Sequence, residues 1–181
     1  MSSSNYFQDL QYILARIDLT QLAAAASVIN GARLAGGTIF TCGNGGAAAE
    51  ASHFAADLGK NVRALPPFRT ICLADSVPAI TAYSNDEGVE QVFSSQLHRH
   101  GRSSDLLIAY SGSGMSANIV EVIKIAEVLD MSVIAIFGDF PVWLPVTVQV
   151  KLGTTVYELN ETAMSACNHY LITALRDLVS A

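Results

Sequence analysis

Two glycine-rich turns, each placed between an apolar run and an amphipathic run, most constrain how this chain can fold. The first glycine turn (residues 43–46, Gly-Asn-Gly-Gly) follows a β-rich apolar segment and precedes an alanine-rich stretch. The serine turn (residues 111–116, Ser-Gly-Ser-Gly-Met-Ser) follows a short apolar run and precedes a run whose apolar residues recur every three or four positions. A short apolar run followed by helical periodicity predicts a strand, a turn and then a helix.

The same alternation continues along most of the chain. Strands are expected at residues 38–42, 69–73, 106–109, 133–137 and 146–152. Helices are expected at residues 6–16, 20–35, 47–58, 78–83, 89–98, 116–129 and 154–178. Strands separated by helices pair in parallel through right-handed crossovers. The sequence therefore predicts an α/β protein, a three-layer α/β/α sandwich with a five-stranded parallel sheet. We expect one domain over 1–181, with packing helices in 1–36 and the α/β core in 37–181.

Composition narrows the function classes. The chain is 51% hydrophobic and only 14% charged, which predicts surface buried in an oligomer. Its apolar runs are strand-sized, so no membrane span is expected. The net charge of −6 and the lack of a basic cluster argue against nucleic-acid binding. Three widely spaced cysteines in apolar runs, and an opening segment without a basic and apolar leader pattern, predict a reduced, cytoplasmic protein.

The serine turn has the composition of a phosphate site. The first N–H groups of the following helix lack intrahelical partners, and Ser111, Ser113 and Ser116 add hydroxyl donors beside them. The alternative is a plain serine N-cap, but three serines and two glycines exceed what a cap requires. The first glycine turn lacks the residues of a P-loop. Two such turns instead predict a ligand lying across the carboxyl ends of the strands.

Two expected helices carry polar residues that core packing does not require. Glu50, His53 and Asp57 share one face because they are three and four residues apart. Glu161 and His169, eight apart on the last helix, lie on neighbouring stripes. Two imidazoles and acidic groups form a plausible zinc site. The alternative, that each is an ordinary surface or core residue, stays open at the level of spacing alone.

These motifs resemble a known family. The segments 42–46 and 53–58 look like the first signature of the phosphoheptose (sedoheptulose 7-phosphate) isomerases, members of the SIS, or sugar isomerase, superfamily. Residues 111–118 resemble that family's phosphate-binding motif, and Asn85-Asp86 matches a pair in its substrate pocket. The resemblance covers nearly the whole chain. It implies a flavodoxin-like SIS fold, aldose–ketose isomerisation of a phosphorylated sugar through an enediol, a zinc ion and a homotetramer.

The resemblance also implies roles for particular residues. Asp57 takes the position of the catalytic base and His169 that of the acid. The implied zinc ligands are His53, Asp57, Glu161 and His169. The implied substrate-binding residues are Asn44, Gly45, Gly46, Asn85, Asp86, Ser111, Ser113, Ser116 and Glu161. On the last helix a one-residue shift would instead match Asn160 and Asn168, which would abolish the site. The chosen register keeps the polar pair and the apolar phase together.

Departures from the family pattern leave the substrate open. Asp57 stands where the family has Glu, and Glu161 where it has Gln, which adds a charge that attracts a divalent cation but repels a phosphate. Gly112 and Ala47 replace hydroxyl residues. One alternative is a non-catalytic SIS module that binds a sugar phosphate or a protein, like the initiator-associating protein that binds DnaA. That branch lacks the paired carboxylate and the last His. A second alternative is an isomerase of a pentose or hexose phosphate.

Overall fold

The computed structural model describes residues 3–139 and 143–180. Its five strands form one parallel sheet in the order β2-β1-β3-β4-β5. The strands are β1 (Thr38–Cys42), β2 (Arg69–Cys72), β3 (Leu106–Ser111), β4 (Ser132–Phe137) and β5 (Val148–Lys151). The α-helices are α1 (Tyr6–Leu14), α2 (Leu19–Leu34), α3 (Gly46–Asn61), α4 (Val77–Asp86), α5 (Ser94–His100), α6 (Ala117–Val128) and α7 (Tyr157–Ser180).

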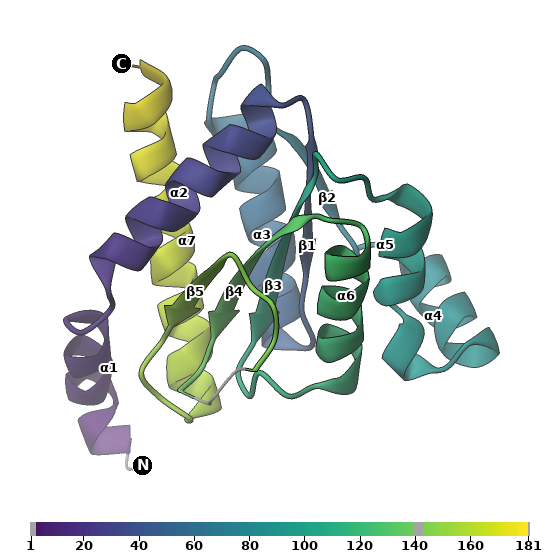
Figure 1. Cartoon of the computed structure of the whole chain (residues 1–181). Coiled ribbons are helices and arrows are strands. Elements are labelled where there is room, and N and C mark those ends of the chain that lie inside the picture. The colour runs from purple at the N-terminus through teal and green to yellow at the C-terminus, as the bar shows by residue number, and fades with distance from the viewer. Residues whose placement is uncertain (1–2, 140–142, 181) are drawn as a thin grey trace.

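Helices cover both faces of this sheet (Figure 1). Alternate residues of β3 divide between the layers, because successive strand side chains point to opposite faces. Leu106, Ile108 and Tyr110 join a core with α2, α3 and α7. Leu107 and Ala109 join a second core with α5 and α6. Burial of each aliphatic side chain contributes roughly 1.5–3 kcal/mol to the stability of the fold. Continuous apolar strands of this kind therefore lie at the centre of a sandwich, covered on both faces.

The strand order reverses between β1 and β3, and this reversal positions the site. From β1 the chain passes through α3 to β2 on one side, whereas from β3 it passes through α6 to β4 on the other. Helices α3 and α6 therefore lie on opposite faces of the sheet. In open α/β sheets, ligands bind outside the carboxyl ends of the strands at such a point. The first glycine turn and the serine turn both end there.

The predicted three-layer fold and five-stranded parallel sheet are confirmed, and one predicted helix is wrong in detail. The expected helix at residues 89–98 divides into a 3-10 turn, Val89–Gln91, and α5. The break lets Val92 and Phe93, adjacent in sequence, both enter the core at 2% exposure. Among the described residues no single helix is long and apolar enough to cross a membrane. Helices α1 and α2 meet the same composition test only as a pair bent by 66°.

Candidate active site

A cavity lies at the carboxyl ends of β1 and β3, closed on one side by the first turns of α7. Its lining combines both glycine-rich turns with α7: Asn44, Ala47, Tyr110, Ser111, Gly112, Ser113, Ser116, Tyr157, Asn160, Glu161 and Met164. The serine turn thus faces the polar end of the last helix. Because these residues come from three separate parts of the chain, the cavity exists only in the folded sandwich.

Two asparagines brace the turns against each other. The Asn44 amide donates to Asn118 Oδ1 at 2.8 Å, and the Asn118 amide donates back to Asn44 Oδ1 at 2.9 Å. Asn118 is the second residue of α6, so the pair fixes the start of α6 to the turn that precedes α3. Asn44 was predicted to bind a sugar hydroxyl, whereas here it uses half of its hydrogen-bonding capacity inside the protein. Asn118 was not among the predicted site residues.

The serine turn is ordered by its own hydroxyls. Ser111 Oγ accepts from the backbone N–H of Gly114 at 2.9 Å, and Ser113 Oγ accepts from that of Met115 at 3.2 Å. Gly114 has φ of +67°, a conformation that glycine adopts without strain. Ser116 is the N-cap of α6 but makes no side-chain capping bond. Its hydroxyl and the first N–H groups of α6 are therefore available to an anion, which favours the phosphate interpretation over a simple cap.

Gly112, which departs from the family pattern, makes room for an aromatic ring. A Cβ on residue 112 would lie 3.1 Å from Cε1 of Tyr157 and 3.6 Å from Nδ2 of Asn160. A hydroxyl-bearing side chain there would press against that ring. Tyr157, itself 62% exposed, thus packs over the serine turn where the family has a larger turn residue.

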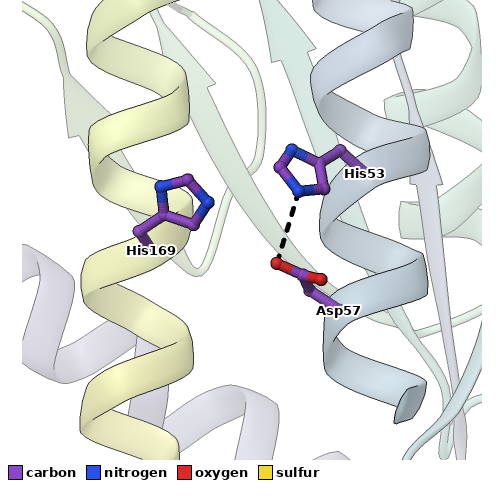
Figure 2. A group of neighbouring side chains, drawn as sticks. All are labelled: His53, Asp57 and His169. Atoms are coloured by element: carbon purple, nitrogen blue, oxygen red, sulfur yellow. Dashed lines mark ion pairs between the residues drawn. The ribbon is translucent and has the colours of Figure 1, made fainter. Parts of the chain in front are cut away.

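Three of the four predicted metal ligands meet between α3 and α7. Ligand atoms of His53, Asp57 and His169 all lie within 4.8 Å of one another (Figure 2). His53 Nε2 is 3.4 Å from Asp57 Oδ2, and the two imidazole rings lie edge to face with centroids 5.4 Å apart. Asn61 Nδ2 donates to Asp57 Oδ1 at 2.6 Å and so orients the carboxylate. Two nitrogens and a carboxylate oxygen suit zinc and leave a coordination position open. We call these residues the His–Asp cluster.

Glu161 stands apart from the His–Asp cluster and lines the cavity instead. A Cβ added to Gly46 would overlap its carboxylate, so Glu161 lies directly over the first residue of α3. A carboxylate at a helix N-terminus is stabilised by the helix dipole. Glu161 and His169 are eight residues apart, a rise of about 12 Å along the helix. Gly45, with φ of +56°, is the N-cap of α3 and lies beside this contact.

The two asparagines of the alternative register are buried. Tyr110 donates its hydroxyl proton to Asn168 Oδ1 at 2.7 Å, and Asn168 Nδ2 donates to the backbone carbonyl and Oε2 of Glu50, both at 3.2 Å. Burial raises the pKa of Tyr110 well above its usual value. Asn168 thus joins α7 to β3 and α3, while His169, one residue on, faces His53. This geometry favours the register that uses Glu161 and His169.

The pair Asn85 and Asp86 is not brought to the cavity of this chain. Both side chains are exposed at the end of α4, where Asn85 Nδ2 donates to Asp86 Oδ1 at 2.7 Å. Helix α4 lies at the opposite end of the molecule from α7 (Figure 1). Neither residue is among those that line the cavity beside the serine turn. Their predicted contact with the substrate stays a prediction.

Comparison with known proteins identifies the family. The SIS domain model matches residues 5–138. The chain therefore belongs to the SIS domain family. Its relatives include the phosphoheptose isomerase of Rhodospirillum rubrum, 41% identical over 118 residues that cover 65% of this chain and 63% of the relative. The phosphoheptose isomerase of Dechloromonas aromatica is 38% identical over 139 residues, 75% of this chain and 71% of the relative. The first of these matches spans just under two thirds of the relative.

Solved structures agree over nearly the whole chain. The phosphoheptose isomerase of Neisseria gonorrhoeae superposes with a TM-score of 0.86 at 27% identity, covering 96% of each chain. That of Francisella tularensis gives 0.89 at 26% identity and covers 98% of this chain and 100% of its own. The chain is thus similar to phosphoheptose isomerases in sequence and in fold, which confirms the resemblance inferred from its motifs.

Proposed function

We propose that this protein is an aldose–ketose isomerase of a phosphorylated sugar, with sedoheptulose 7-phosphate as the first substrate to test. The proposal rests on one observation: His53, Asp57 and His169 converge at one seam, between α3 and α7, and the serine turn lies at the end of that seam where both helices begin. The similarity to phosphoheptose isomerases supports it. We also propose that the whole chain forms one SIS domain, of which the family model covers residues 5–138.

In this proposal the phosphate binds at the serine turn. Ser111, Ser113 and Ser116 with the first N–H groups of α6 surround the anion, and the helix dipole favours its charge. The sugar chain then runs along the seam toward the His–Asp cluster. The backbone of Gly45 and Gly46 lies beside this path. A ligand held at both ends has its reacting carbons placed against the acid and the base, which accounts for much of an enzyme's rate advantage.

The His–Asp cluster has the groups that isomerisation requires. Asp57 accepts the proton from the carbon next to the carbonyl, the electron pair of that C–H bond becomes a C=C bond, and His169 protonates the carbonyl oxygen. Protonated Asp57 then returns its proton to the former carbonyl carbon, while the hydroxyl on the adjacent carbon gives its proton to His169 and becomes the new carbonyl, which completes the exchange of aldose and ketose. Zinc held by His53, Asp57 and His169 would polarise the sugar oxygens, and Asp57 and His169 would have to loosen from it to act as base and acid. Glu161 can join as a fourth ligand only if its carboxylate leaves Gly46.

The exposed apolar surface and the buried thiols support two further proposals, an oligomeric state and a location. Apolar side chains of the N-terminal helices are exposed in the single chain, Phe7 at 80% and Tyr12 at 63%, and Leu19 and Leu34 at 58% and 61%. We propose that they pack in a homotetramer. Cys42, Cys72 and Cys167 are free and buried, which supports a cytoplasmic protein.

The test is an isomerase assay of the purified protein with sedoheptulose 7-phosphate, combined with metal analysis. We expect turnover, about one zinc per chain, and loss of activity on chelation that added zinc restores. Pentose and hexose phosphates in the same assay define the sugar length. A second candidate, a non-catalytic SIS module, is favoured by one observation: Glu161, a ligand implied by the resemblance, stands apart from the His–Asp cluster. No zinc and no turnover, with sugar-phosphate binding intact, would establish that module instead.

A further inference from the structure

The cavity contains a buried amide oxygen that the protein itself leaves unpaired. Asn160 is 1% exposed and lines the cavity beside Glu161. Its Nδ2 donates to the backbone carbonyl of Gly112 at 3.5 Å, but its Oδ1 has no hydrogen-bond partner among the described residues. Nearly all buried polar atoms in folded proteins are paired, so an exception inside a cavity calls for a donor from outside the chain.

The position of this oxygen is fixed by its surroundings. A Cβ on Gly138 would lie 2.9 Å from Asn160 Nδ2 and would overlap the carbonyl oxygen of Gly112. The turns that follow β3 and β4 therefore pack closely against Asn160, and a side chain at residue 138 would not fit between them. The amide nitrogen is held toward Gly112, and the amide oxygen cannot exchange places with it without losing that bond.

One side of the cavity carries hydrogen-bond donors and the other side carries acceptors. The serine turn and the start of α6 supply N–H and O–H donors. Helix α7 supplies two acceptors, the amide oxygen of Asn160 and the carboxylate of Glu161. A phosphate group near neutral pH is chiefly an acceptor, so it belongs with the donors. A sugar hydroxyl donates, so it belongs with the acceptors. The two sides together can orient a molecule that carries both groups.

We propose that Asn160 is a specificity-determining residue whose Oδ1 accepts a hydrogen bond from a hydroxyl of the phosphosugar bound at the serine turn. The inference rests on the proposed function for the identity of the ligand, but it concerns binding and not turnover. This hydrogen bond would let the site distinguish a phosphorylated sugar from inorganic phosphate. A site that hydrogen-bonds a hydroxyl rejects the analogue lacking it, because its buried acceptor is then left unpaired.

The experiment is calorimetric titration of the wild type and of Asn160→Leu with two probes, sedoheptulose 7-phosphate and inorganic phosphate. We expect Asn160→Leu to bind the phosphosugar at least about 10-fold more weakly and inorganic phosphate within about twofold of the wild type. Gln149→Leu is the matched control, because Gln149 Nε2 is also buried without a partner but lies on β5, outside this cavity. That control should bind both probes as the wild type does.

Other results overturn the proposal. Equal weakening of both probes would make Asn160 a structural support of the serine turn, and unchanged binding would mean that a water molecule satisfies its oxygen. A second measurement needs no variant: monodeoxy analogues of the phosphosugar are titrated into the wild type, and one should bind about 10-fold more weakly than the parent. If every analogue binds equally, the proposal fails. Tight, Asn160-dependent binding without turnover would refute the isomerase proposal alone.

Discussion

Two stripes of α7, one residue apart along the chain, have different surroundings: one is buried and the other faces the candidate site. Asn160 and Asn168, the buried stripe, are 1% and 2% exposed, and their side-chain hydrogen bonds go to other parts of the chain, although Asn160 also lines the cavity. Glu161 and His169, the site stripe, face the cavity and the opposite helix α3. A step of one residue turns a helix by about 100°, enough to carry a side chain from the core to the seam. Polar residues on a helix thus reveal their role by what they face and not by their type.

The largest effect is expected on the site stripe. His169→Ala removes the proposed acid and one zinc ligand, so turnover of sedoheptulose 7-phosphate should fall by about 100-fold or more. Zinc content should fall with it. The melting temperature should stay close to that of the wild type, because His169 is exposed and supports no core contact. Isomerase rates, metal analysis and thermal melting check this. His100→Ala, at the exposed end of α5, is the control. Undiminished turnover would remove His169 from the mechanism.

The buried stripe should respond in stability. Asn168→Leu leaves the Tyr110 hydroxyl without its acceptor inside the core, at a cost of about 2–3 kcal/mol in the free energy of unfolding. Chemical denaturation measures this cost. The double variant Asn168→Leu with Tyr110→Phe should recover about half of the loss, because both partners are then apolar. A loss that the second change does not relieve would assign the effect to the Glu50 contact instead.

The buried stripe also predicts how stability depends on pH. Burial raises the pKa of Tyr110 well above its usual value and that of Cys167, beside Asn168, to about 12. Above pH 9 to 10 the unfolded chain releases these protons while the folded chain retains them, so the free energy of unfolding falls as pH rises. Each group contributes up to about 1.4 kcal/mol per pH unit. Tyr110→Phe should flatten the alkaline limb of a denaturation series; an unchanged slope contradicts the assignment.

The sequence predicted the fold because its signals are local and repeated. Apolar strands alternate with amphipathic helices, and each glycine-rich turn marks the carboxyl end of a strand. Residue spacing also brought His53 and Asp57 together, since a separation of four residues fixes a shared helix face. The convergence of His169 with them depends on how α7 packs against α3, and the resemblance supplied that step.

Other features of the site depend on packing that no local pattern encodes. The separation of Glu161 from the His–Asp cluster is a choice of side-chain direction, set by the open backbone at Gly46. The pairing of Asn44 with Asn118 joins residues 74 positions apart. The remote position of Asn85 in a single chain follows from where α4 packs. An asparagine in the first glycine turn and another just after the serine turn were the one available signal for the Asn44–Asn118 brace.

A smaller effect is expected where the serine turn meets α7. Gly112→Thr restores a hydroxyl but presses its Cβ against the Tyr157 ring, which we expect to weaken sugar-phosphate binding about 10-fold by displacing the turn. Titration calorimetry with sedoheptulose 7-phosphate measures it. The double variant Gly112→Thr with Tyr157→Ala relieves the contact and should regain most of the affinity. Failure to regain it would show that the turn, and not the ring, is sensitive to the added side chain.

The smallest effect is expected from substitutions of Glu161. They test whether Glu161 binds zinc together with His169. Glu161→Gln keeps an oxygen ligand and removes the charge, whereas Glu161→Leu removes both. With the carboxylate held at Gly46, both variants should keep full zinc content and bind inorganic phosphate about twofold to fivefold more tightly, since a negative charge has left the cavity. Added salt should reduce the gain. If Glu161→Leu loses zinc while Glu161→Gln retains it, the side chain turns toward His169 in solution, and the four-ligand set implied by the family resemblance holds.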